Sequence, residues 1–128
     1  MPTAITNNVK ITVETSYQNT RFSKNGSEHM FAYRITIVNK GDYTIKLLRR
    51  HWFIFDPIAG NSEVEGEGVV GQMPILEPGE THQYVSGCAL LSDIGKMHGT
   101  YLMERQIDGK HFKVSIPEFY LIAPFRNN

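Results

Sequence analysis

The sequence predicts an all-β protein, folded as an antiparallel β-sandwich. Several segments alternate apolar and polar residues with the period of two that a half-buried strand requires. Glycine and proline separate these segments at short intervals, as turns between strands do. No stretch carries apolar residues at the i, i+3, i+4 and i+7 spacing over enough length for a stable helix.

The first strands follow from this alternation. Residues 9–15 and 31–38 each place apolar side chains at every second position, and residues 39–42 then supply a polar turn containing glycine. The long run 43–55 carries apolar residues on both parities. It is therefore expected to contain a β-bulge or a change of buried face.

The remaining strands are expected at residues 80–87, 99–107 and 111–116, with a turn at 57–61. The dipeptide Asp108-Gly109 predicts a tight hairpin, because glycine tolerates the positive φ that such a turn demands. Seven or eight short strands in one domain, residues 1–128, favour a sandwich of immunoglobulin-like or fibronectin type III-like architecture.

Composition and charge limit the range of functions. Thirteen Lys and Arg residues balance thirteen Asp and Glu residues, so no overall field would attract the chain to nucleic acid. The single cysteine, Cys88, cannot form an internal disulfide. The N-terminal residues lack the features of a signal peptide, and no apolar run is long enough to span a membrane. We therefore expect a cytoplasmic protein.

A G-x-G-x-x-G string at Gly66, Gly68 and Gly71 is the sharpest candidate binding site. A nucleotide-binding fingerprint needs a helix directly after the loop, and Pro74 and Pro78 exclude one here. We favour a bulged connection through which the chain crosses between the two sheets. The alternative is a nest of exposed N–H groups that holds a phosphate, although the neighbouring Glu65 and Glu67 would repel an anion.

A second candidate is the basic pair Arg49 and Arg50, which would contact a partner protein. In a regular strand Arg49 and His51 share one face, while Arg50 lies with Lys46 on the other. The competing interpretation is that one arginine bonds a carboxylate or carbonyls at a strand end and that Trp52 fills the core.

No catalytic or metal-binding constellation is evident. The five histidines are scattered, so we expect no metal site, with a weak divalent site built from distant His and Asp side chains as the alternative. Cys88 is expected to be a buried small hydrophobic residue. Glu63, Glu65 and Glu67 would share a face, as a metal-assisted hydrolase needs, only if their segment is extended.

An ordered set of residues along the chain resembles the ApaG family. The set comprises Arg49, His51, Trp52, Asp56, residues 65–71, Pro74, residues 78–80, Tyr84, Ser86, Gly87, Gly95, Met97, residues 99–101, Phe112, residues 116–119 and Pro124. The resemblance implies a fibronectin type III-like sandwich. Bacterial members are linked by genetics to cobalt resistance and magnesium efflux and have no established enzymatic activity. Similar domains in F-box proteins and in a DNA-polymerase-delta-interacting protein look like protein-binding modules, and the glycine loop has been discussed as a pyrophosphate site.

We therefore expect a non-enzymatic binding protein without a cofactor. Its partner would be a protein of unknown identity, and its cellular effect would concern divalent-cation homeostasis. A sensor that weakly binds a phosphate compound through Gly66 to Gly71 is the alternative, and a hydrolase is the third hypothesis. The oligomeric state is left open.

Overall fold

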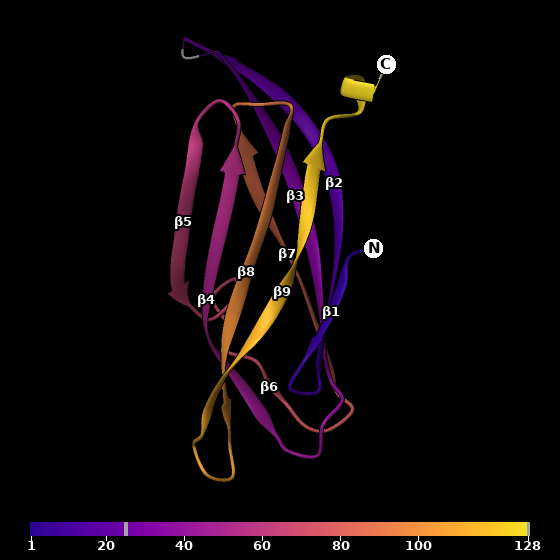
Figure 1. Cartoon of the computed structure of the whole chain (residues 1–128), viewed down its shortest axis with the longest axis vertical. Helices are drawn as coiled ribbons and strands as arrows, with labels where there is room; N and C mark the ends of the chain where they lie inside the picture. Colours follow the sequence, from indigo (N-terminus) through magenta and orange to yellow (C-terminus); the bar gives the residue numbers. More distant parts are fainter. Residues whose placement is uncertain (25, 128) are drawn as a thin grey trace.

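The computed structural model describes residues 1–24 and 26–127, and within them it contains two antiparallel sheets packed as a sandwich (Figure 1). The strands are β1 (Thr3–Thr6), β2 (Val9–Ser23), β3 (Gly26–Asn39), β4 (Ile45–Asp56), β5 (Gly60–Glu67), β6 (Ile75–Leu76), β7 (Thr81–Leu90), β8 (Ile94–Arg105) and β9 (His111–Ile122). A 3₁₀ turn, η1 (Pro124–Asn127), follows β9. The predicted antiparallel β-sandwich is confirmed.

The two sheets have different edges. One sheet has the strand order β1-β2-β3-β7 and the other β5-β4-β8-β9, while the short β6 pairs with β4. At the β9 edge the sheets are joined, because the Asn7 side chain donates a hydrogen bond to the Lys113 carbonyl and the Ser115 N–H donates one to the Thr6 hydroxyl. The strands β5 and β7 form the other, open side, and Figure 1 shows β5 beside β4 at the outer margin of its sheet.

A β-bulge at Leu48 divides β4 into two halves. The pairing of β4 with β8 shifts register between Leu47 and Arg49. Ile45 and Leu47 are buried before the bulge, and Trp52 is buried after it, so the inward parity changes from odd to even. The predicted irregularity in this strand is confirmed.

Trp52 lies at the centre of the hydrophobic core, where it is 2% exposed. Its ring centroid is 5.3 Å from that of Tyr33 on β3 and 5.8 Å from that of Phe119 on β9, both in edge-to-face arrangements. Such aromatic pairs add to the free energy that area burial contributes. The rings link the two sheets, and the predicted burial of Trp52 is correct.

Some strands differ from the sequence prediction. The strands β1, β5 and β6 were not predicted, and β2 runs to Ser23, well beyond residue 15. The β8–β9 hairpin exists, but it has a four-residue loop, because the Arg105 N–H bonds the Lys110 carbonyl and the Gly109 N–H bonds the Arg105 carbonyl. No helix in the described residues has the length and apolarity needed to cross a membrane.

The Asp56 carboxylate joins two turns at one end of the sandwich. It accepts N–H groups from Ile58 and Ala59 in the turn after β4, at 3.0 and 3.2 Å. It also accepts those of Leu91 and Ser92 after β7, at 2.7 and 3.2 Å. Burial acts to raise the pKa of this carboxyl, but the four N–H bonds outweigh burial and lower the pKa below its ordinary value.

We expect Trp52→Ala to lower the free energy of unfolding by about 3–5 kcal/mol, because it leaves a cavity between the two sheets. Urea denaturation followed by circular dichroism measures the change. The matched control is Phe22→Ala, which truncates an aromatic ring that is 83% exposed and should change stability by less than about 0.5 kcal/mol. Equal effects of the two substitutions would contradict the assigned core.

A second prediction concerns the loss of folding stability at low pH. Because the folded-state pKa of Asp56 is depressed, its stabilisation is present above the unfolded-state pKa and is lost as the pH falls through the folded value. We expect Asp56→Asn to cost about 1–3 kcal/mol at pH 7. The variant should also lose less stability than the wild type between about pH 5 and pH 2. Parallel pH profiles of the wild type and the variant would show that the carboxylate charge is unimportant.

Candidate functional site

The glycine loop lies on the open edge of β4, between β5 and β6. Both flanking strands pair with β4, since Glu67 lies opposite Arg49 and Ile75 lies opposite Lys46. The loop therefore connects two strands that pair with the same edge of β4, and it stays within one sheet. The expectation that the chain crosses between sheets at this loop is wrong, because the crossing takes place later, between β6 and β7.

The tip of the loop is a tight turn from Val69 to Gln72. The N–H of Val69 donates to the Gln72 carbonyl at 2.8 Å, and the N–H of Gln72 donates to the Val69 carbonyl at 3.0 Å. Val70 and Gly71 between them have φ values of 48° and 76°, as a type I′ turn requires. Val69 is buried in the core and anchors the turn.

Gly68 has a separate role at the base of this turn. Its φ is 60°, and a Cβ on it would lie 2.2 Å from the carbonyl oxygen of Gln72. Its N–H donates to the Leu48 carbonyl at 2.8 Å. The N–H groups of Gly68, Val69 and Gln72 are thus already bonded to backbone carbonyls, so they are not free to hold an anion.

Arg50 holds the loop from the inward side of β4. Its guanidinium donates to the carbonyl oxygens of Glu67 and Gly68, at 2.9 and 3.1 Å. A Cβ on Gly66 would lie 2.9 Å from the two terminal nitrogens of Arg50, so Gly66 makes room for this side chain. The guanidinium bonds carbonyls at the end of a strand, which is the competing interpretation given above for one of the two arginines.

Arg49 points to the opposite, outer face with His51, as predicted. The placement of Arg50 beside Lys46 is wrong, because the bulge at Leu48 lies between them and turns Arg50 inward. The basic pair is therefore split, and only Arg49 remains on the outer surface, 3.9 Å from the Glu67 carboxylate. A partner-binding role for Arg49 and Arg50 stays a prediction.

The three glutamates of β5 share the outer face, because this segment is extended. The Nδ1 atom of His51 lies 2.9 Å from the Glu65 carboxylate, and its Nε2 atom lies 3.5 Å from that of Glu63. No group of three or more His, Cys, Asp or Glu side chains among residues 1–24 and 26–127 is arranged to hold a metal ion. The arrangement places one partly buried imidazole between two exposed carboxylates on the outer face.

Inside the sandwich, Arg50 lies near a cluster of tyrosines that the sequence did not single out. The hydroxyls of Tyr84 on β7 and Tyr101 on β8 share a hydrogen bond, and the Tyr33 hydroxyl bonds Ser86. Burial raises the pKa of all three phenols, while the charge of Arg50 opposes this rise. The phenols are neutral near pH 7.

Cys88 was expected to be buried, but it is only partly buried against the core, and its thiol is protonated near pH 7. Burial, assisted by the negative charge of Asp56, raises the pKa of its thiol to about 11. A thiol nucleophile needs the opposite shift. This site therefore supplies no activated cysteine.

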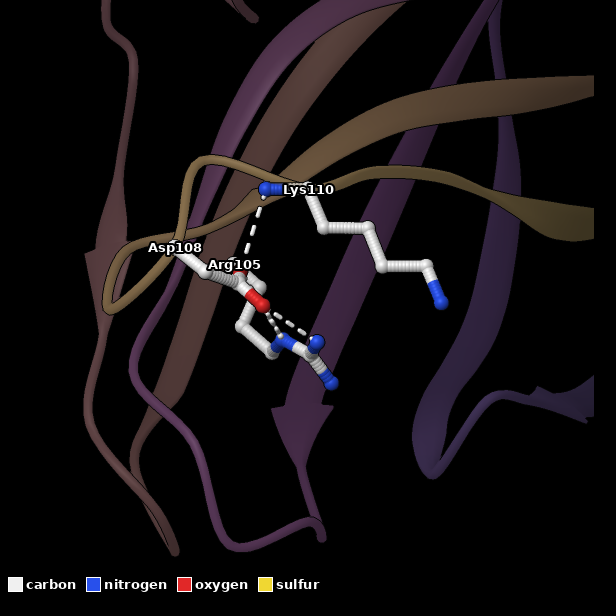
Figure 2. A network of polar contacts seen from close by, with 3 residues as sticks. All are labelled: Arg105, Asp108 and Lys110. Carbon is white, nitrogen blue, oxygen red and sulfur yellow. Dashed lines mark hydrogen bonds and ion pairs between the residues drawn. The ribbon is translucent and has the colours of Figure 1, made fainter.

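At the far end of the molecule, the β8–β9 loop is fixed by its own charges (Figure 2). The Arg105 guanidinium bonds the Asp108 carboxylate, which also accepts the Lys110 N–H at 3.1 Å. These bonds to Arg105 and Lys110 lower the pKa of Asp108 to about 2. Arg105 also lies over the Tyr43 ring, and both side chains line a hollow of about 230 Å³. Because the guanidinium is already bonded to Asp108, its charge stabilises the β8–β9 loop.

The fold and the loop together define a small two-sheet β-sandwich with a structural glycine loop on one sheet edge. A family model for the ApaG domain matches residues 19–105, and the chain belongs to the ApaG family. It is 44% identical to Protein ApaG of Paramagnetospirillum magneticum, over 93% of this chain and 91% of the relative. It is 40% identical to Protein ApaG of Rhodopseudomonas palustris, over 94% and 92% of the two chains.

Solved structures agree with this assignment. An X-ray structure from the Northeast Structural Genomics Consortium matches with a TM-score of 0.88 and 40% identity, covering 92% of this chain and 89% of the other. The crystal structure of a putative ApaA protein from Bordetella pertussis matches with a TM-score of 0.82 and 38% identity, covering 96% of both chains.

The loop geometry predicts unequal effects of two alanine substitutions. Gly71→Ala should cost about 1–2 kcal/mol for a left-handed backbone alone, because a Cβ there meets nothing within 4 Å. Gly68→Ala should cost clearly more, since its Cβ would also collide with the Gln72 carbonyl. Thermal and urea unfolding measure both, and equal losses would contradict the proposed role of Gly68.

Proposed function

We propose that this protein is a non-enzymatic protein-binding module. The observation that carries the proposal is the open side of the sandwich, where β5 and β7 leave two sheet edges without a neighbouring strand in the described residues. Unpaired strand edges are ready templates for pairing with another chain.

An exposed aromatic surface beside β5 supports the same function. Phe53 and Phe55 project from the outer face of β4, and Phe53 stacks between His51 and His98 at centroid distances of 4.4 and 5.1 Å. A hollow borders these rings, and Lys96 is part of its lining, with its Nζ atom 5.8 Å from the centroid of the Phe55 ring. Aromatic side chains are enriched where proteins bind one another.

We further propose that the partner acts in divalent-cation homeostasis, in the cytoplasm. Membership of the ApaG family supports this proposal through the genetic link of bacterial members to cobalt resistance and magnesium efflux. No catalytic residue, metal ligand or cofactor enters the proposal.

The test is affinity purification from the native cytosol with the tagged full-length chain, with and without added cobalt. A protein enriched over the tag alone would then be purified and its direct binding measured by calorimetry. We expect one reproducible partner that binds the purified chain. The absence of any direct binder under both conditions would contradict the proposed function.

The alternative function is a sensor of a phosphate compound through Gly66, Gly68 and Gly71. The positive φ of Gly68 and Gly71 favours it, while the three N–H groups already bonded in the loop and the neighbouring glutamates oppose it.

The two functions differ in their response to phosphate ligands. We expect millimolar pyrophosphate, ADP or ATP with magnesium to leave the melting temperature unchanged. A true ligand at about 100 times its dissociation constant would add about 2.7 kcal/mol to the folded state. A saturable shift in the wild type that is lost in a folded Gly68→Ala variant would favour the sensor.

A further inference from the structure

The open edges of β5 and β7 differ in how well their side chains prevent pairing with a strand of another molecule. The β5 edge carries Glu63, Glu65 and Glu67, and charged side chains discourage pairing with another strand. The ten residues of β7, Thr81–Leu90, include no Asp, Glu, Lys, Arg or Pro. Their pairing with β3 runs without a bulge. A long, regular and uncharged edge has none of the features that keep monomeric sheets apart.

The hydrogen-bonding phase of this edge is fixed by one contact. The Asn39 N–H donates to the Glu80 carbonyl at 3.0 Å, directly beyond the pair formed by Val38 and Thr81. In an antiparallel ladder this makes Val38 and Thr81 a non-hydrogen-bonded pair. The backbone groups that point to the open edge are therefore those of Thr81, Gln83, Val85, Gly87 and Ala89.

The sheet that contains β7 ends before it covers β5. Val64 on β5 lies opposite Trp52, and their side chains share the inward face. Trp52 is 2% exposed, whereas Val64 is 41% exposed, so the opposite sheet covers β4 but not β5. One further strand beside β7 would extend that sheet towards the uncovered face of β5.

The outer face of β7 also exposes an apolar side chain, Val85. A hollow of about 230 Å³ lies over β2 and β3, away from the open edge, and Val85 is the β7 residue in its lining. Val85 itself is 51% exposed. An added strand would thus lie next to two exposed apolar side chains, Val64 on the inner face of β5 and Val85 on the outer face of β7.

We propose that the β7 edge binds an extended, uncharged segment of a partner protein as an additional strand, with apolar side chains at alternate positions facing β5. This inference rests on the proposed protein-binding function and specifies its site. A second copy of this chain fits less well, because pairing β7 with β7 would bring a second β5, with its three glutamates, towards the first.

The test uses displayed ten-residue peptides, matching the length of β7. One library alternates Val or Ile with Thr, Ser, Asn or Gln, and a second library carries Lys and Glu at the polar positions. We expect the uncharged library to yield binders of roughly micromolar affinity. In amide exchange, binding should protect the N–H groups of Gln83, Val85 and Gly87. Failure to obtain any binder below about 1 mM, or protection confined to β5, would overturn the proposal.

Two proline variants separate the edges. Val85→Pro removes an edge-facing N–H without removing a bond to β3, and we expect it to weaken peptide binding about tenfold or more. Glu65→Pro is the matched control, because the Gly68 N–H bond to Leu48 places the Glu65 N–H on the open edge of β5. It should leave peptide binding unchanged. If circular dichroism shows that Val85→Pro does not fold, Val85→Lys takes its place by adding a charge to the edge.

Two further outcomes would contradict the β7 binding site or its occupant without contradicting the proposed protein-binding function. A natural partner that binds the wild type and folded Val85→Pro equally would overturn the β7 site and leave the protein-binding function intact. Sedimentation equilibrium tests the second copy. A dimer that dissociates in the Val85→Pro variant would overturn the choice of occupant.

Discussion

The single extra residue in β4 is the constraint on which the core and the glycine loop of this protein depend. Leu48 interrupts the pairing with β8 and reverses the parity of the strand, so Arg50 and Trp52 both turn inward. Without the reversal, an apolar core position would be occupied by His51. Bulges re-aim side chains in this way at sheet edges and are often found near functional surfaces.

The bulge also explains the glycine loop. Arg50 reaches the loop only because it faces inward, and its guanidinium there satisfies two carbonyl oxygens that the loop leaves without a strand partner. The spacing of Gly66, Gly68 and Gly71 is that of a dinucleotide fingerprint, yet each glycine has a local cause in this fold. Gly66 gives space to the Arg50 side chain, Gly68 permits the close approach of the Gln72 carbonyl, and Gly71 completes the turn.

The sequence predicted the parts of the fold in which one face of a strand is buried. The alternation in residues 9–15 and 31–38 follows directly from that burial, as does the irregularity of β4. Strand β5 was missed because both of its faces are exposed, which leaves no hydrophobic period to detect. The tyrosine cluster was missed for another reason. Tyr33 and Tyr84 lie on one sheet and Tyr101 lies on the other, and only the packing of the two sheets brings them together.

The position of Trp52 has a consequence for spectroscopy. It is the only tryptophan, and it lies in an apolar site within 6 Å of the rings of Tyr33 and Phe119. Its emission therefore comes from a single dry environment at the contact between the two sheets, and tyrosine excitation can be transferred to it over a short distance. The wavelength of that emission reports whether the sheets are packed together, without any added label.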